Sequence, residues 1–242
     1  MVNEDIRYAA LDTAMHGRLF LDSSLAGPRP GVLVFPEGFG ISEHTYGIAE
    51  RLAALGYVAL AADLYGGGFF HNGPSPEIAA RNAKITADPA RMSAVGRSAF
   101  DLLAARPEVD AGRIAACGHC FGGTLATALA FSGAPVVAVA SLHPSFRGLE
   151  LDKAANARCP IHLFVGAEDY AAPPAARAGF EAAMAGTGIR WRMTVYGGVK
   201  HGFTNPDCEG MGEKVAYDAE ADADSWAQMT ALFAEAFAAR RD

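Results

Sequence analysis

Cysteine is scarce in this chain, with four residues among 242 at irregular spacing: Cys117, Cys120, Cys159 and Cys208. That number is too small for a disulfide framework in so long a chain, so a hydrophobic core must supply the stability. Positive charge is also in short supply, because 20 Lys and Arg stand against 27 Asp and Glu without any basic stripe. This balance argues against nucleic acid as a partner.

Long apolar runs are missing as well. No run approaches the ~20 residues that a membrane-spanning helix needs, so no membrane association is expected. Glu4 and Asp5 stand where a signal peptide requires positive charge. These features predict a cytoplasmic protein.

What the chain does contain is an alternation of short apolar runs and helical patterns, in a composition that is 51% hydrophobic and 19% charged. Strands are expected at 32–35, 57–62, 114–117, 136–142, 161–165 and 190–196. Helices are expected at 43–55, 76–105 with a break near 88–89, 124–131, 173–185 and 219–239. The order predicts one α/β domain over residues 1–242, with a mostly parallel sheet and helices on both faces.

The segment from Gly118 to Gly122 follows a buried strand and opens a helix with the pattern G-x-C-x-G. This is the cysteine form of the nucleophile elbow, in which glycines let strand and helix pack around a strained central residue. A cysteine at a helix N-terminus also lies where unpaired N–H groups favour a thiolate. Cys120 is therefore a candidate nucleophile. The alternative is a small buried hydrophobic residue among glycines that only serve packing.

An acid and a histidine follow in the chain order that an elbow nucleophile requires. Asp169 comes after a predicted strand, with Glu168 as the rival acid, and His201 lies on a glycine-flanked loop after the last strand. Both would reach the carboxyl edge of the sheet, where ligands bind. Taken singly, they could equally be a surface acid and a turn histidine.

Further candidates lie in the loop after the first central strand. An oxyanion hole would use the N–H of Phe121, which follows the nucleophile, and one from this loop, for which Gly38 is the candidate. Glu37 brings a carboxylate near the site and is a candidate acceptor of the thiol proton. The alternative is that Glu37 caps a turn or pairs with an arginine.

With these motifs the chain resembles the dienelactone hydrolase family, α/β-hydrolases with a Cys-His-Asp triad. The resemblance rests on FPEGFG at 35–40, GYVALAADLYG at 56–66, GHCFGG at 118–123, VGAED at 165–169 and KHGF at 200–203. It implies the α/β-hydrolase fold, with neither metal nor organic cofactor. It implies that Cys120 is the nucleophile and that Asp169 and His201 complete the triad. It also implies that Glu37 is the carboxylate that assists the cysteine, and that Gly38 and Phe121 are the two oxyanion donors.

The sequence departs from the family at one position that concerns the substrate. The best-known members carry an arginine soon after the catalytic histidine, and this arginine grips the substrate carboxylate, whereas Asn205 stands here. Arg81 matches a second carboxylate-binding arginine, with Arg91 or Arg97 as alternatives. The segment at 205–220 is expected to cover the pocket and set specificity.

The chemistry of a thiolate restricts the substrates. A thiolate is expelled readily from a tetrahedral intermediate, so the other leaving group must compete with it. Lactones that open to an enolate, enol esters, aryl esters and thioesters meet this condition, whereas amides and simple alkyl esters do not. We therefore expect a hydrolase of activated esters or lactones of small molecules, acting as a monomer or a small homo-oligomer.

Three other functions remain open. Cys117 and Cys120 have the C-x-x-C spacing of thiol-disulfide oxidoreductases. A non-catalytic ligand-binding protein or a redox sensor would keep the pocket or the reactive thiol without hydrolysis. Zinc binding would use the two cysteines with His119 or His143. Without zinc, His143 either lines the pocket or fills the core.

Overall fold

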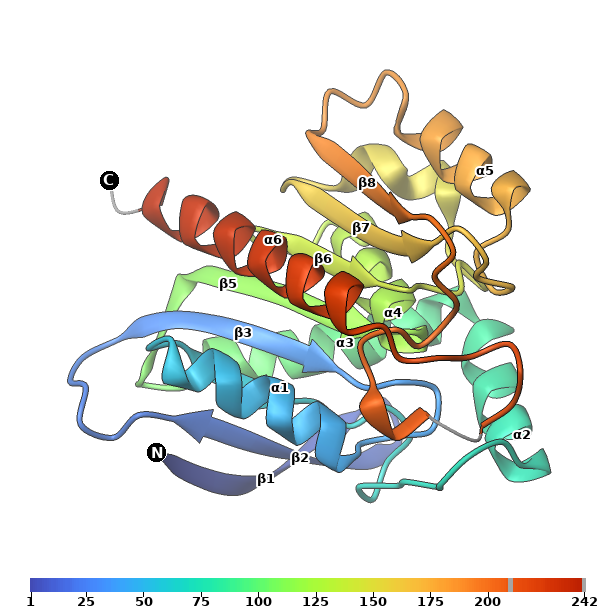
Figure 1. Ribbon diagram of the computed structural model, residues 1–242. Helices are drawn as coiled ribbons and strands as arrows, with labels where there is room; N and C mark the ends of the chain where they lie inside the picture. The colour runs from blue at the N-terminus through green and yellow to red at the C-terminus, as the bar shows by residue number, and fades with distance from the viewer. Residues whose placement is uncertain (209–210, 241–242) are drawn as a thin grey trace.

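The computed structural model describes residues 1–208 and 211–240, built around one eight-stranded sheet (Figure 1). The strands are β1 (Val2–Ala10), β2 (Thr13–Leu21), β3 (Arg29–Phe35), β4 (Val58–Ala61), β5 (Val109–His119), β6 (Val139–Leu142), β7 (Ile161–Gly166) and β8 (Trp191–Tyr196). Their order in the sheet is β1-β2-β4-β3-β5-β6-β7-β8. Pairing is antiparallel from β1 through β2 to β4 and parallel from β4 to β8, so the expected mostly parallel sheet is confirmed.

Helices cover both faces of this sheet. They are α1 (Glu43–Ala54), α2 (Pro76–Thr86), α3 (Pro89–Ala104), α4 (Phe121–Phe131), α5 (Pro174–Met184) and α6 (Ala219–Ala238), with 3-10 turns η1 (Leu151–Asn156) and η2 (Pro206–Cys208). Figure 1 shows α1 and α6 side by side on one face, with α3 and α4 behind the sheet. No helix within the described residues combines the length and the apolar character needed to cross a membrane.

Two separate cores form because successive strand residues point to opposite faces. In β3, Leu33 and Phe35 belong to the core that α3, α4 and α5 cover. Val32 and Val34 belong to the other core, which α1 and α6 cover. All four side chains are fully buried, as expected for a central strand of a parallel sheet.

The N-terminal hairpin of β1 and β2 is the part of the sheet that the sequence patterns do not predict. Only Ile6 and Ala10 of β1 are buried, so this edge strand has no apolar run to mark it. Its register, from Val2 opposite Leu21 to the Ala10–Thr13 pair, is held mainly by backbone hydrogen bonds of the antiparallel ladder. A strand of this kind depends on its neighbour rather than on its own hydrophobic pattern.

Candidate active site

Loops from five neighbouring strands meet at the carboxyl edge of the parallel part of the sheet. They carry Glu37 after β3, Cys120 after β5, His143 after β6, Asp169 after β7 and His201 after β8. Ligands of open α/β sheets bind at this edge. The fold thus brings together residues that lie up to 164 positions apart in the chain (201 − 37).

Cys120 is the single residue between β5 and α4, and its backbone has φ 54° and ψ −116°. A non-glycine residue in such a conformation carries a cost of about 1–3 kcal/mol that its surroundings must offset. A Cβ on Gly118 would collide with the backbone of Gly122, and one on Gly122 with the end of β3. The N–H of Cys120 donates to the carbonyl of Leu142 at 2.9 Å and to Nδ1 of His143 at 3.1 Å. The turn is therefore the sharp elbow that the glycine pattern predicts.

His201 contacts Asp169 in a buried pair. Its Nδ1 lies 2.8 Å from Oδ2 of Asp169, and the two side chains are 6% and 0% exposed. The other carboxylate oxygen accepts the N–H of Ala171 at 2.7 Å, which fixes its orientation. Glu168, the rival acid, is exposed. Asp169 is thus the acid that is joined to the imidazole.

The charge of His201 depends on the sulfur of Cys120 as well as on Asp169. Burial by itself lowers the pKa of the imidazole, but the charge and hydrogen bonding of Cys120, together with Asp169, raise this pKa well above its ordinary value. Cys120 and His201 also line the same cavity. Together, Cys120 and Asp169 favour the imidazolium form of His201.

This cavity has a volume of about 420 Å³, which is the size of a small-molecule site. Among the side chains that line it are several that lie outside the sequence motifs, namely Asn82, Thr86, Ser145, Arg147 and Tyr170. The ring of Tyr170 packs edge-on against that of His201, with 5.4 Å between the ring centroids. The cavity wall beside the imidazole of His201 is therefore aromatic.

The two expected oxyanion donors, Gly38 and Phe121, both line the cavity. Phe121 is the first residue of α4, where helix geometry provides no intrahelical acceptor for its N–H. The carbonyl of Gly38 accepts hydrogen bonds from the hydroxyl of Tyr65 at 2.8 Å and from Nδ2 of Asn82 at 3.2 Å. These bonds fix the loop that carries the second N–H.

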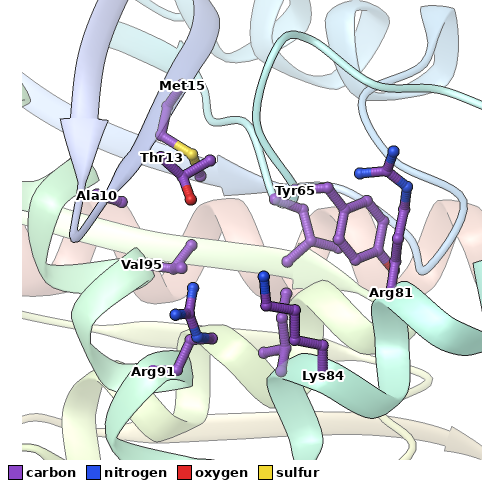
Figure 2. Close-up of a pocket in the computed structure, with 10 residues that line it drawn as sticks. Ala10, Thr13, Met15, Tyr65, Arg81, Lys84, Arg91 and Val95 are labelled. Carbon is purple, nitrogen blue, oxygen red and sulfur yellow. The ribbon is translucent and has the colours of Figure 1, made fainter.

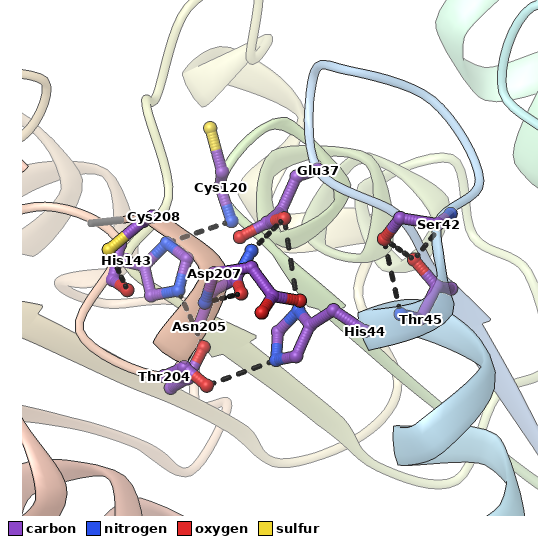
Figure 3. Close-up of polar contacts among 11 residues, drawn as sticks. Glu37, Ser42, His44, Thr45, Cys120, His143, Thr204, Asn205, Asp207 and Cys208 are labelled. Carbon is purple, nitrogen blue, oxygen red and sulfur yellow. Dashed lines mark hydrogen bonds and ion pairs between the residues drawn. The ribbon is translucent and has the colours of Figure 1, made fainter. Parts of the chain in front are cut away.

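Glu37 lies outside this cavity and is buried behind the nucleophile turn (Figure 3). Its Oε2 accepts a hydrogen bond from Nδ2 of Asn205 at 2.8 Å and faces Nδ1 of His44 at 3.8 Å. Burial raises the pKa of the Glu37 carboxyl, but the neighbouring His44 and the hydrogen bond from Asn205 outweigh it and leave this pKa below its ordinary value. The cationic partner of Glu37 is thus a histidine, and not the arginine that the sequence left open.

His143 is fully buried beneath the same turn and does not line the cavity. Its Nδ1 accepts the N–H of Cys120, and its Nε2 lies 2.9 Å from the hydroxyl oxygen of Thr204. Burial, together with the neighbouring histidines, holds the pKa of His143 well below its ordinary value. Of the two expected positions for His143, pocket wall or core, the structure places it in the core.

Arg81 does not line the cavity that holds Cys120. Its guanidinium pairs with Glu77 one turn earlier on α2 at 2.9 Å and lies over the ring of Phe69, 3.8 Å from the centroid. With Arg91 and Lys84 it lines a separate, smaller cavity of about 80 Å³ (Figure 2).

The other two arginines named from the sequence are also absent from this lining. Arg91 pairs with Asp12 at 3.6 Å, and Arg97 pairs with Asp101 along α3 at 2.8 Å. Among the arginines and lysines of the described residues, the one that lines the cavity is Arg147, an exposed residue in the loop after β6. Sequence spacing could not find it, because nothing in the loop pattern marks its direction.

The segment at 205–220 was expected to cover the pocket, but none of its described residues, 205–208 and 211–220, lines the cavity. Residues 209–210 lie outside the described part of the chain. Asn205 instead points beneath the nucleophile turn to Glu37. The first residue of the segment therefore supports Glu37 rather than a cavity wall, whereas Lys214 lies over the ring of Tyr170, with Nζ 5.5 Å from the centroid.

Cys117 does not share the surroundings of Cys120. It is fully buried in β5, in the core covered by α1 and α6, and burial raises the pKa of its thiol. A dithiol exchange centre needs two accessible sulfurs, and the sulfur of Cys117 is not accessible. Within residues 1–208 and 211–240, no group of three or more His, Cys, Asp or Glu side chains is arranged to hold a metal ion, so the zinc alternative has no site there.

Comparison with known proteins gives consistent similarities. The dienelactone hydrolase family model matches residues 15–237. A Synechocystis sp. protein, whose name assigns it provisionally to the carboxymethylenebutenolidases, is 29% identical over 221 residues, covering 86% of each chain. The solved structure of a dienelactone hydrolase-like promiscuous phosphotriesterase from metagenomic libraries superposes with TM-score 0.92 at 32% identity, covering 97% of this chain and 98% of that one. A structure named m3DLH has TM-score 0.92 at 39% identity, covering 98% of both chains.

Proposed function

Because this chain belongs to the dienelactone hydrolase family and is accordingly an α/β-hydrolase that cleaves carboxylic esters, we propose that it hydrolyses activated esters or lactones of small molecules through a thioester on Cys120. One observation carries this proposal. The imidazole of His201, held by Asp169 at 2.8 Å, lines the same cavity as Cys120. A nucleophile, a base and an orienting acid in one cavity are the parts that acyl transfer needs.

In the first half of the reaction, the thiol proton of Cys120 passes to His201, and the resulting thiolate Sγ attacks the carbonyl carbon. The negative charge moves to the carbonyl oxygen, where the N–H groups of Gly38 and Phe121 are proposed to stabilise it. The carbon–oxygen bond to the leaving group then breaks, and His201 returns the proton to that oxygen. The products are an alcohol or enol and a thioester on Cys120.

In the second half, His201 takes a proton from water, and the resulting hydroxide attacks the thioester carbonyl. The carbon–sulfur bond breaks, the acid leaves, and the proton returns to the pair of Cys120 and His201. Asp169 keeps one proton on Nδ1 throughout, so that Nε2 is the nitrogen that exchanges protons. Glu37 is proposed to assist activation of the cysteine from behind the nucleophile turn.

The substrate class follows from the leaving group. Expulsion of the thiolate competes with expulsion of the alcohol, so aryl esters, enol esters, lactones and thioesters are favoured over amides and alkyl esters. Arg147 supplies a cation at the cavity, which favours substrates that carry a carboxylate. This preference would come from the loop after β6, because Arg81, Arg91 and Arg97 lie away from Cys120.

The test uses a substrate panel with two cysteine variants. Wild type is expected to hydrolyse p-nitrophenyl acetate and an aryl lactone much faster than ethyl acetate or acetanilide. Cys120→Ala should abolish hydrolysis, and mass spectrometry of the wild type during turnover should find one acyl group on the peptide that contains Cys120. Cys117→Ala is the matched control, since Cys117 is buried away from the cavity and should retain activity within about threefold. Activity that survives in Cys120→Ala, or that disappears in a folded Cys117→Ala, would refute the proposal.

A further inference from the structure

Five polar residues with buried side chains lie close together near Cys120 (Figure 3), and none of them lines the cavity. This set consists of Glu37 after β3, His44 at the start of α1, His143 after β6, and the adjacent Thr204 and Asn205 after β8. Glu37 and His44 face each other at 3.8 Å, and their side chains are only 9% and 10% exposed. Neither lines the cavity, so neither is placed to touch a bound substrate. Their effect on the reaction must pass through other residues.

The hydrogen bonds of this set determine where its protons lie. The backbone N–H of Cys120 donates to Nδ1 of His143, so that nitrogen carries no proton. The proton of the neutral His143 ring is therefore on Nε2, which donates it to the hydroxyl oxygen of Thr204 at 2.9 Å. The carbonyl of Thr204 accepts in turn from Nε2–H of His44 at 3.0 Å. A continuous chain of contacts thus joins His44 to the nucleophile.

The remaining nitrogen of His44, Nδ1, faces the carboxylate of Glu37. A neutral ring would direct a lone pair at that carboxylate, whereas an imidazolium directs an N–H. Burial lowers the pKa of His44, but Glu37, assisted by Asp222 at the start of α6, raises it above its ordinary value. The other two histidines nearby are neutral, because burial lowers the pKa of His119 to about 3 and that of His143 as well. The positive charge therefore resides on His44.

We propose that His44 and Glu37 form a buried imidazolium–carboxylate pair that positions Cys120 for attack, acting through Thr204 and His143. The functional part of this inference rests on the proposed role of Cys120 as the nucleophile. Asn205 donates only a neutral hydrogen bond to Glu37. The cation that the buried carboxylate requires comes instead from His44.

A histidine in this position makes the pair sensitive to pH, which an arginine would not. The folded-state pKa of His44 is raised, so the stability it contributes is complete below the ordinary histidine pKa of 6.5 and is lost as pH rises through the raised value. The folded-state pKa of Glu37 is lowered, so its contribution is complete above 4.5 and is lost as pH falls through the lowered value. Both residues of the pair are therefore charged between the lowered pKa of Glu37 and the raised pKa of His44.

The first test is an NMR titration of ¹³C-labelled histidine in the wild type and in Glu37→Gln, with His44→Gln used to assign the His44 resonance. His44 should titrate above its ordinary pKa in the wild type. In Glu37→Gln its pKa should fall by at least about one unit, because an opposite charge at this distance contributes about 1–3 units. An ordinary pKa in the wild type, or an unchanged one in Glu37→Gln, would overturn the ion pair. The titration needs no enzymatic activity, so its result is independent of the role of Cys120.

The second test compares the kinetics of His44→Gln, Glu37→Gln and the double variant on p-nitrophenyl acetate. Each single variant should lower kcat by about 10- to 100-fold through misplacement of the nucleophile, with KM nearly unchanged because the cavity lining is intact. The double variant should be no slower than the slower single variant, because either change removes the pair. His16→Gln, the same change at a half-buried position on β2, is the matched control and should behave as wild type.

Additive losses in the double variant would mean that the two residues act separately, and His44→Gln with wild-type kcat would mean that the pair does not position Cys120. Thermal unfolding of each variant separates both results from a loss of folded protein. If Cys120→Ala remained active while the His44 titration responded to Glu37→Gln, the proposed nucleophile would be wrong and the ion pair would stand.

Discussion

Replacing Asp169 by asparagine would remove one charge while nearly preserving the shape of the side chain. The carboxylate lies 2.8 Å from Nδ1 of His201 and is fully buried, so little solvent screens the contact. With an effective dielectric constant of about 20, two unit charges at this separation interact by about 6 kcal/mol. Since an amide still offers a hydrogen-bond partner and the ring can relax, a loss of about 4–5 kcal/mol in transition-state stabilisation is expected. This corresponds to a loss in kcat/KM of about 10³- to 10⁴-fold.

The assay is hydrolysis of p-nitrophenyl acetate by Asp169→Asn as a function of pH. The carboxylate helps to raise the pKa of His201, so its removal should shift the alkaline limb of the profile, where the imidazolium is lost, to lower pH. Glu168→Gln is a matched control, because it makes the same change one residue earlier on an exposed side chain. It should retain activity within about twofold.

Two results would refute this reasoning. If Asp169→Asn retained more than a tenth of wild-type kcat/KM, the buried contact would not govern the imidazole. If Glu168→Gln lost as much activity as Asp169→Asn, the effect would come from the charge of the loop rather than from the 2.8 Å contact. Thermal unfolding of both variants distinguishes either result from a loss of folded protein.

Three further predictions concern the cavity wall, the turn at Cys120 and the contacts beneath that turn. Arg147→Ala should raise KM about tenfold or more for an ester that carries a carboxylate but not for p-nitrophenyl acetate, and Arg81→Ala should leave both values nearly unchanged in the same steady-state assay. Gly122→Ala should destabilise the fold by about 3 kcal/mol or more in urea denaturation, because its Cβ would collide with backbone that cannot move aside. Thr204→Val should cost about 1–3 kcal/mol in the same measurement by leaving Nε2–H of His143 buried without an acceptor.

The parallel sheet and its helices could be predicted because local pattern and burial agree along that part of the chain. The run from Val32 to Phe35 is apolar on both faces, and the strand it predicts is buried on both faces. Ser42 accepts the N–H of Thr45 and caps α1 where the helical pattern begins. The hairpin of β1 and β2 could not be predicted in this way, since an exposed edge strand is held by ladder hydrogen bonds that leave no hydrophobic period.

The residues of the candidate site also fall into two groups: those that a local sequence pattern identifies, and those whose position depends on contacts between distant parts of the chain. The glycines of the nucleophile turn identify Cys120 because the backbone conformation there is a local property of five residues. Asp169 and His201 could be named because chain order and strand ends place them at one edge of the sheet. Which way a side chain leaves a loop does not follow from such rules. Arg81 lies on α2 and Arg147 in the loop after β6, and the family resemblance points to the one that lies away from Cys120.

The sequence by itself therefore determined the fold class and the residue at the elbow, because both follow from periodicity and from the conformational freedom of glycine within short segments. Only the tertiary structure decided that His44 faces Glu37, that Thr204 and His143 connect them to Cys120, and that Arg147 lines the cavity. The physical reason is that most of these contacts join residues from distant parts of the chain, and that even the nearby pair of Glu37 and His44 meets only through the fold of the loop after β3. Their partners are selected by how the side chains pack at the sheet edge, which no local pattern encodes.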